Sequence, residues 1–507
     1  GNSIVSVSNA NIVIAPNGTG KVDINGNLDV DGGTIKLDGN YPTGTDNVAL
    51  GDTALDSVEA SGIDNTAIGS KAGTAITSGD RNTAVGSCSL DANSTGSNNT
   101  AIGQLALSTN TTASDNTAIG RASLFTNETG DKNTALGSSA LNKNTTGGCN
   151  TAVGQDAMNA NTTGANNAAI GKGSMGSNTT GSDNTAMGVE ALVTATTAAS
   201  NAAFGRQAMC KTTTGANNTA MGAFALCANT TASNNTAVGK DSLKANTTGT
   251  GNTAVGYLSL DANQTTSCNT AVGEGALTAN ITNCNTAVGY YAGSATTTGG
   301  RNVFVGLQAG QANTTGALNT AIGEKASYTN ITASSNTSLG HRALYTNVAS
   351  NNTAVGDSAL YANTTASNNT AVGLNSLGAN TTAAQNTAVG ACALASTTTG
   401  GCNTGVGYLS LNTNTEGTSN VAVGRGTLQL NTTGASNVAV GRQALNNNTT
   451  GDGNTASGYY ALNDNTTADN NTASGYYALE KNTTGSENVA VGSLALDANT
   501  TGDNNVA

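Results

Sequence analysis

The sequence predicts an all-β repeat solenoid, or β-roll, of about 27 coils of 17 residues each. An asparagine that opens the pattern N-[TVA]-[AFSG]-[VILMFS]-G recurs 28 times from Asn47 to Asn505, and all but three of the intervals are 17 residues long. The exceptions are an interval of 18 residues after Asn47 and intervals of 16 after Asn269 and Asn336. A strict short period indicates a stack in which each copy packs mainly on its two neighbours.

Residues 1–46 precede the repeat, and we expect them to form a β-rich connector segment, with the solenoid shaft occupying residues 47–507. Strand-like runs at 4–7, 11–16, 21–24 and 34–37 are separated by the turn dipeptides Asn17-Gly18, Asn25-Gly26 and Asp38-Gly39. The chain therefore divides into two parts, the connector and the repeat.

The repeating unit has the idealised form N-T-A-V-G-x-x-A-L-x-x-N-T-T-G-x-x, and the copy at 99–115 is a clear example. A glycine at position 5 of every copy and apolar pairs at positions 3/4 and 8/9 do not fit a helix. Short apolar segments bounded by Gly and Asn are typical of strands and turns. We predict two strands per copy, at positions 2–4 and 7–10, with N-T-T-G as the return loop and parallel pairing between copies.

The glycine at position 5 is present in all 27 complete copies, beginning with Gly51, Gly69, Gly86, Gly103, Gly120 and Gly137. A positive φ, or a corner too crowded for a Cβ atom, explains such uniformity. The asparagines at positions 1 and 12 are predicted to stack into amide ladders from copy to copy, which would satisfy polar groups at the turns.

Both apolar pairs predict an oligomer. Neighbouring side chains of a strand point to opposite faces, so one member of each pair would fill the interior and the other would face outward. A lone solenoid would then expose two continuous apolar stripes, far more than a monomer normally tolerates. We therefore expect a homotrimer of parallel chains, about 130 Å long from 27 steps of about 4.8 Å.

Composition excludes several classes of partner. The formal net charge is −12, and only 9% of the residues are charged. An acidic chain without Lys/Arg runs predicts no nucleic-acid partner, and the absence of an apolar run of 18 residues predicts no membrane insertion.

We find no catalytic motif, no metal-ligand spacing and no cofactor motif, so we expect the chain not to be an enzyme and to bind no cofactor or metal. The single histidine, His341, lies at the variable position 6 and is interpreted as incidental. Tyrosines recur at matching positions of successive copies, and they are either candidate glycan contacts or stacked ladders that stabilise the sheet. These are Tyr328, Tyr345, Tyr361, Tyr459, Tyr460, Tyr476 and Tyr477.

Two cysteine pairs share a position in adjacent copies. Cys210 and Cys227 are both at position 10, and Cys268 and Cys284 both occupy the last position. Stacked neighbours about 4.8 Å apart lie within the Cα separation that a disulfide requires. Assembly in a reducing cytoplasm would leave these thiols free, so both states stay open.

The repeat N-T-A-[VI]-G-x-x-A-L-x-x-N-T-T-G resembles repeats of phage tail fibres. Its core is also similar to the head repeats of bacterial trimeric autotransporter adhesins, which are trimers of coiled β-rolls with a shorter unit. The run at 11–22 resembles the N-I-x-[IL]-x-P-N-G-T-G-x-V segment common near the start of phage fibre shafts.

This resemblance implies a structural fibre, the shaft of a phage tail fibre in the virion, that displays a distal receptor-binding tip for attachment to the host cell. The partners implied are two further copies of the chain, other virion or fibre components at its ends, and a host surface receptor bound through segments outside this chain. The alternative is a trimeric adhesin on a bacterial cell surface whose repeat face binds glycan or matrix. An ice-binding solenoid is a third hypothesis, which the adjacent threonines of N-T-T-G disfavour.

Overall fold

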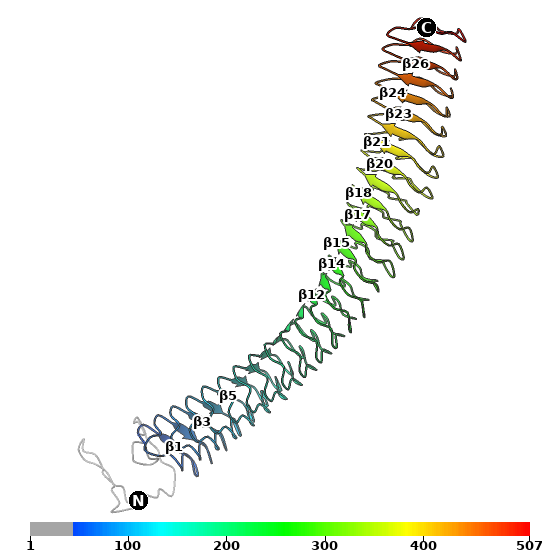
Figure 1. The fold of residues 1–507 in the computed structure, drawn as a ribbon. Helices are drawn as coiled ribbons and strands as arrows, with labels where there is room; N and C mark the ends of the chain where they lie inside the picture. The colour runs from blue at the N-terminus through cyan, green and yellow to red at the C-terminus, as the bar shows by residue number, and fades with distance from the viewer. Residues whose placement is uncertain (1–43) are drawn as a thin grey trace, which may run out of the picture.

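The computed structural model describes residues 44–507, so nearly all of the predicted connector at 1–46 lies outside the described part. The described chain winds into a long curved rod of stacked coils (Figure 1). Each coil contributes one three-residue strand, and together they form a 27-stranded parallel sheet along the rod. The predicted all-β parallel solenoid is therefore confirmed.

The strands occupy positions 2–4 of each copy, where the strand-forming Thr, Ala and Val or Ile recur. They are β1 (Val48–Leu50), β2 (Thr66–Ile68), β3 (Thr83–Val85), β4 (Thr100–Ile102), β5 (Thr117–Ile119), β6 (Thr134–Leu136), β7 (Thr151–Val153), β8 (Ala168–Ile170), β9 (Thr185–Met187), β10 (Ala202–Phe204), β11 (Thr219–Met221), β12 (Thr236–Val238), β13 (Thr253–Val255), β14 (Thr270–Val272), β15 (Thr286–Val288), β16 (Val303–Val305), β17 (Thr320–Ile322), β18 (Thr337–Leu339), β19 (Thr353–Val355), β20 (Thr370–Val372), β21 (Thr387–Val389), β22 (Thr404–Val406), β23 (Val421–Val423), β24 (Val438–Val440), β25 (Thr455–Ser457), β26 (Thr472–Ser474) and β27 (Val489–Val491).

The prediction of a second strand at positions 7–10 is wrong, since each described coil contains only the strand at positions 2–4. In the copy at 99–115 these positions lie in two successive turns, closed by bonds from Ala106 N to Gly103 O (3.2 Å) and from Asn110 N to Leu107 O (3.2 Å). Position 7 has a φ of +60° at Leu105, and position 9 has a φ of +50° at Leu107. Positive φ values are incompatible with a strand, and they turn consecutive side chains toward the same side.

This local geometry also changes which residues fill the interior. At positions 3 and 4, Ala101 is fully buried and Ile102 is 38% exposed, as predicted for a strand. At positions 8 and 9, however, Ala106 and Leu107 are both fully buried. The prediction that one member of the second pair faces outward is therefore wrong, and the chain carries one outward apolar row instead of two.

Hydrogen bonds between coils extend well beyond the sheet. In the turn segment, Leu105 N donates to Ser87 O of the preceding coil (3.0 Å). In the return loop, Thr111 N donates to Glu128 O of the following coil (3.2 Å). A continuous ladder along the rod therefore satisfies backbone groups that a second sheet was expected to satisfy.

The asparagines at positions 1 and 12 both form ladders, in two different ways. At position 12, the amide nitrogen of Asn110 donates to Oδ1 of Asn93 in the preceding coil (2.8 Å). At position 1, Oδ1 of Asn99 accepts the backbone N–H of Asn116 (3.0 Å), while its own amide donates to the carbonyl of Ala113 at position 15 (2.8 Å). Both buried side chains thus tie one coil to the next and close the return loop.

The corner glycine is required for both of the anticipated reasons. Gly103 has a φ of +132°, a conformation that residues with a Cβ rarely adopt. A Cβ atom at Gly103 would also lie 2.5 Å from the carbonyl oxygen of Gly120 in the next coil. Close stacking of the corners therefore excludes any larger residue.

Candidate functional surfaces

The outward face of the sheet is the most extended surface feature. Position 2, usually Thr, and position 4, usually Val or Ile, both point outward, because position 3 points into the core. Exposed large apolar side chains at position 4 recur from the first strand to the last: Leu50, Ile68, Ile102, Leu136, Ile170, Met187, Met221, Val288, Ile322, Leu339, Val389, Val423, Val440 and Val491. This row, the position-4 row, is replaced by serine only at Ser457 and Ser474.

Aromatic side chains gather along a different part of the coil. Every tyrosine of the described residues lies at position 6, 7 or 10. Positions 7 and 10 are neighbours across coils, since the amide of Asn142 at position 10 donates to the carbonyl of Ala122 at position 7 of the preceding coil (2.8 Å). The tyrosines therefore share one corner, away from the sheet face.

The candidate glycan-contact tyrosines stack on one another. Tyr345 lies between Tyr328 and Tyr361, with ring centroids 5.2 Å apart on each side and interplanar angles of 7° and 11°. Such stacking covers the ring faces that a sugar would need, so this geometry favours the ladder interpretation.

The four tyrosines near the C-terminal end form a compact cluster. Tyr459 stacks on Tyr476 at 5.5 Å, and Tyr460 stacks on Tyr477 at 5.3 Å. Desolvation by neighbouring groups raises the pKa of Tyr477 to about 12, and the charges that would form on Tyr476 and Tyr459 add to this shift. The cluster therefore favours the neutral form of the Tyr477 phenol.

No catalytic constellation is found around His341. Its Nδ1 lies 3.2 Å from Oδ2 of Asp357 in the next coil, and both side chains are largely exposed. A hydrogen bond from Ser358 lowers the pKa of the Asp357 carboxyl, and a hydrogen bond with His341 adds a smaller contribution in the same direction. Oγ of Ser358 donates to Oδ1 of the same carboxyl (2.6 Å), and an exposed pair of this kind has little effect on stability.

Residues 44–507 lack two kinds of feature, a metal-ligand cluster and a membrane-spanning helix. That part of the chain contains no cluster of three or more His, Cys, Asp or Glu side chains that could hold a metal ion. It also contains no helix long and apolar enough to cross a membrane.

A group of charged side chains lies in the coils beginning at Asn235 and Asn252. Nζ of Lys244 is 3.0 Å from Oδ1 of Asp241 and 5.6 Å from the ring centroid of Phe224. The hydrogen bond with Asp241 raises the pKa of Lys244, while partial burial raises the pKa of Asp261. Lys244 and Asp241 are therefore paired with each other, and Lys244 also lines a shallow hollow together with Lys211 and Asp261.

The two stacked cysteine pairs differ. Cys210 and Cys227 are joined by a disulfide with a Cα separation of 4.9 Å. Cys268 and Cys284 are exposed free thiols, although they occupy equivalent positions of adjacent copies. Cys284 lies beside the shortened return loop of its own copy, which is one residue shorter than the loop that precedes Cys268.

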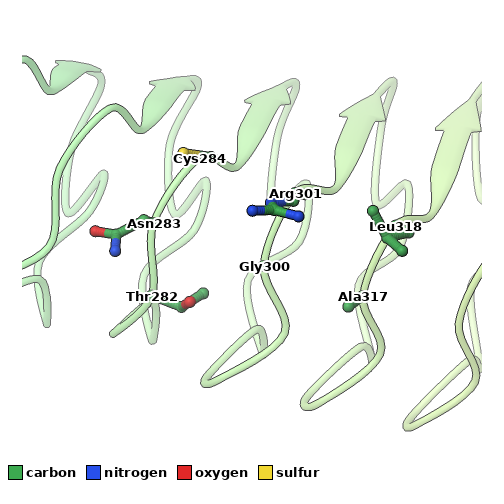
Figure 2. A pocket seen from close by; sticks show the side chains of 7 residues that line it. All are labelled: Thr282, Asn283, Cys284, Gly300, Arg301, Ala317 and Leu318. Carbon is green, nitrogen blue, oxygen red and sulfur yellow. The ribbon is translucent and has the colours of Figure 1, made fainter.

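The sequence analysis missed a hollow of about 440 Å³ on three successive coils at the first shortened copy. Figure 2 shows its lining side chains, with Arg301 between those of the two neighbouring coils. They are Thr282, Asn283, Cys284, Gly300, Arg301, Ala317 and Leu318. The sequence signal for this hollow is a 16-residue copy followed by two copies that carry Gly300 and Ala317 at position 16. The first of these two copies also has a cation, Arg301, at position 17.

No protein-family model matches this chain, and a comparison with curated proteins finds no similar sequence. The class that fold and surface define is therefore the parallel β-solenoid with tandem 17-residue repeats.

Proposed function

We propose that the chain is a structural fibre, the shaft of a phage tail fibre, and that three parallel copies form it. The observation that carries this proposal is the position-4 row. It exposes an apolar stripe along the described rod, interrupted by serine only at Ser457 and Ser474. A stripe of this length exceeds the apolar patches that monomeric proteins leave in water.

The single stripe supports one interface per chain. Three copies around a common axis would each turn the sheet face inward and bury the position-4 row against two partners. Burial of one Val at each coil contributes about 1.5–3 kcal/mol, and this contribution repeats along the rod. The parallel register of the strands gives every coil an equivalent position at that axis.

The proposed role follows from shape and surface together. A rod of about 26 steps at about 4.8 Å spans roughly 125 Å, enough to hold an attachment tip away from a virion surface. In this proposal the shaft is extracellular, joins other fibre components at its ends, and leaves receptor recognition to segments outside this chain. The resemblance of the repeat to phage tail fibres supports the assignment to a phage.

Native mass measurement of the purified protein tests the assembly. We expect a species of three chain masses for the native sequence. Val238→Asp combined with Val255→Asp places charges in the position-4 row and should release monomers that keep the solenoid circular-dichroism spectrum. The matched control, Thr248→Asp with Thr265→Asp, alters exposed loop positions of the same two coils and should remain trimeric. A stable, folded monomer of the native sequence would overturn the proposal.

A further inference from the structure

The first shortened copy, 269–284, changes the backbone hydrogen bonding of the coil that follows it. In the regular coils, the N–H at position 17 donates to the position-16 carbonyl of the preceding coil, as Leu318 N does to Gly300 O (3.2 Å). Within the described chain, the N–H of Arg301 makes no such bond. The return loop before it lacks one residue, so the expected acceptor, the carbonyl of Asn283, is displaced.

A second ladder, which is also missing in other coils such as those of Asp131 and Gly148, is absent at the same place. In many coils, the position-16 N–H donates to a side-chain oxygen at position 16 of the next coil, as Ser97 N does to Oγ of Ser114 (3.0 Å). Gly300 and Ala317 carry no such oxygen. Within residues 44–507, the N–H groups of Asn283 and Gly300 consequently find no protein acceptor.

Three backbone donors are therefore left unpaired beside the hollow. Two of them, on Gly300 and Arg301, are consecutive, and Arg301 has a φ of +60°. Successive N–H groups that end in a left-handed residue form a concave nest that binds anions. The guanidinium of Arg301 supplies a full positive charge at the same site, and none of the seven lining residues is acidic.

Size and side-chain chemistry define the ligand further. A hollow of about 440 Å³ is much larger than a lone anion, and it lies within the range of small-molecule sites. Thr282 and Asn283 offer a hydroxyl and an amide, while Leu318, 56% exposed, offers an apolar surface. One cation on a chain of net charge −12 matches a monoanion better than a dianion.

We propose that this hollow binds an acidic saccharide, with the sugar carboxylate held by Arg301 and the unpaired N–H groups of Asn283 and Gly300. Sugar hydroxyls would meet Thr282 and Asn283, and a sugar C–H face would lie on Leu318. The site goes beyond the proposed shaft function and does not depend on it, because it needs only these three coils of the folded chain.

The second shortened copy, 336–351, provides an internal comparison. It leaves the position-17 N–H of Asn368 unpaired in the same way. Oγ of Ser350 at its position 16 accepts the N–H of Ser334 (3.0 Å), just as Oδ1 of Asn283 accepts the N–H of Ser267 in the first shortened copy (2.7 Å). Among the described residues, the N–H of Ser367, next to Asn368, is unpaired as well, because Ala384 at position 16 of the following coil carries no side-chain oxygen. The second copy therefore has the same backbone donors as the first, and Asn368 stands where the first has the cation of Arg301.

Ligand-observed NMR titration of the intact protein with sodium D-glucuronate tests the proposal. D-glucose and sodium acetate are titrated in parallel, to separate the contributions of the carboxylate and of the sugar ring. Arg301→Gln removes the cation. Gly300→Ser adds a side chain to the hollow and restores the acceptor for Asn283. The matched control, Gly148→Ser, makes the same change at position 16 of a coil of regular length.

We expect glucuronate to bind more tightly than either glucose or acetate. Loss of a charge-assisted contact should weaken glucuronate binding about tenfold or more in Arg301→Gln. Gly300→Ser should also weaken binding, and Gly148→Ser should leave it unchanged, with native masses equal throughout. Glucose binding equal to glucuronate, or full binding by Arg301→Gln, would overturn the anion site. Acetate binding as tight as glucuronate would overturn the saccharide assignment.

Discussion

The two shortened copies, 269–284 and 336–351, respond to the same deletion in different ways. In both, strand pairing keeps its register: Thr270 pairs with Thr286 and Thr337 pairs with Thr353. In both, the loss falls in the return loop and leaves one position-17 N–H unpaired. The first copy borders the hollow that Gly300 and Arg301 line, and the second has Ser367 and Asn368 at the equivalent positions. The sheet and corners therefore fix the rod, whereas loop side chains decide what a deletion produces.

The coils between the two shortened copies are also the least regular in their interior. Position 9 is glycine at Gly293 and Gly310, where most copies have leucine. The space is filled by Phe304 at position 3, which is fully buried. A Cβ on Gly293 would lie 2.6 Å from Cδ2 of Phe304. A large residue at one position and two small ones at another thus conserve the packed volume across two adjacent coils.

Further along, the apolar core is interrupted. One buried cluster ends at Ala326 and the next begins at Ala343. Between them, the hydroxyls of Ser327 and Ser338 lie 2.9 Å apart, fully enclosed in the coil. The coils on either side of the second shortened copy are therefore joined by a polar pair, unlike the continuous apolar stack of the coils at 82–183.

The largest effect is expected from Phe304→Ala, which leaves a cavity beside Gly293 and Gly310 in two adjacent coils. Deletion of a buried phenylalanine costs about 3–5 kcal/mol. Hydrogen exchange of the segment 285–320 should accelerate strongly, while exchange at 99–183 should not change, since distant coils contact only their own neighbours.

The compensation itself is tested by adding Gly293→Leu and Gly310→Leu to Phe304→Ala. Both glycines have φ values near those of the position-9 leucines, +57° and +59° against +50° at Leu107, so leucine introduces no additional strain there. We expect the triple variant to recover most of the lost protection. A triple variant that exchanges as fast as Phe304→Ala alone would show that packed volume is not what holds this section.

Part of this architecture was predictable from the sequence and part was not. The Asn spacing and the invariant glycine predicted the solenoid, the strands at positions 2–4 and the ladders, because each depends on one residue type at one place. The turns at positions 7–10 were not predictable from the apolar pair at 8 and 9, because adjacent apolar residues occur in strands and in turns with positive φ alike. The hollow at Arg301 depends on missing hydrogen-bond acceptors, which a pattern of present residues does not display.

The second-largest effect concerns the polar pair. Ser327→Leu with Ser338→Ala restores the usual residues at positions 9 and 3, and burial of leucine should stabilise this section by about 1.5–3 kcal/mol. Ser338→Ala alone should instead destabilise it by about 1–3 kcal/mol, because the Ser327 hydroxyl loses its partner. Hydrogen exchange across 319–352 measures both. Equal exchange in the two variants would contradict the stated role of the pair.

A smaller difference is expected in the position-12 ladder. At Thr397 the ladder is broken in a section of regular copies, and Oδ1 of the preceding Asn380 is buried without a partner. Thr397→Asn should supply the donor and stabilise the neighbouring coils by about 1 kcal/mol. Thr296→Asn, next to the first shortened copy, should gain less, because Oδ1 of Asn280 already accepts from Asn285 (2.9 Å). A larger gain at Thr296, measured by thermal unfolding, would contradict this difference.

The smallest expected effect concerns stability at alkaline pH, for which two groups of tyrosines are compared. Next to the first shortened copy, Tyr290 and Tyr291 form a pair on a single coil, whereas Tyr477 belongs to a four-ring stack on two coils. The pKa of Tyr477, about 12, lies above the ordinary value of about 10 for tyrosine. The folded state therefore holds the phenol proton of Tyr477 more tightly than the unfolded state does. The resulting stabilisation is complete below about pH 10 and is lost as the pH rises toward about 12.

Tyr477→Phe should therefore reduce the steepness of alkaline unfolding in that window and remove one late-titrating phenol from the ultraviolet absorbance curve. An unchanged absorbance curve would show that the stacked rings do not protect this phenol.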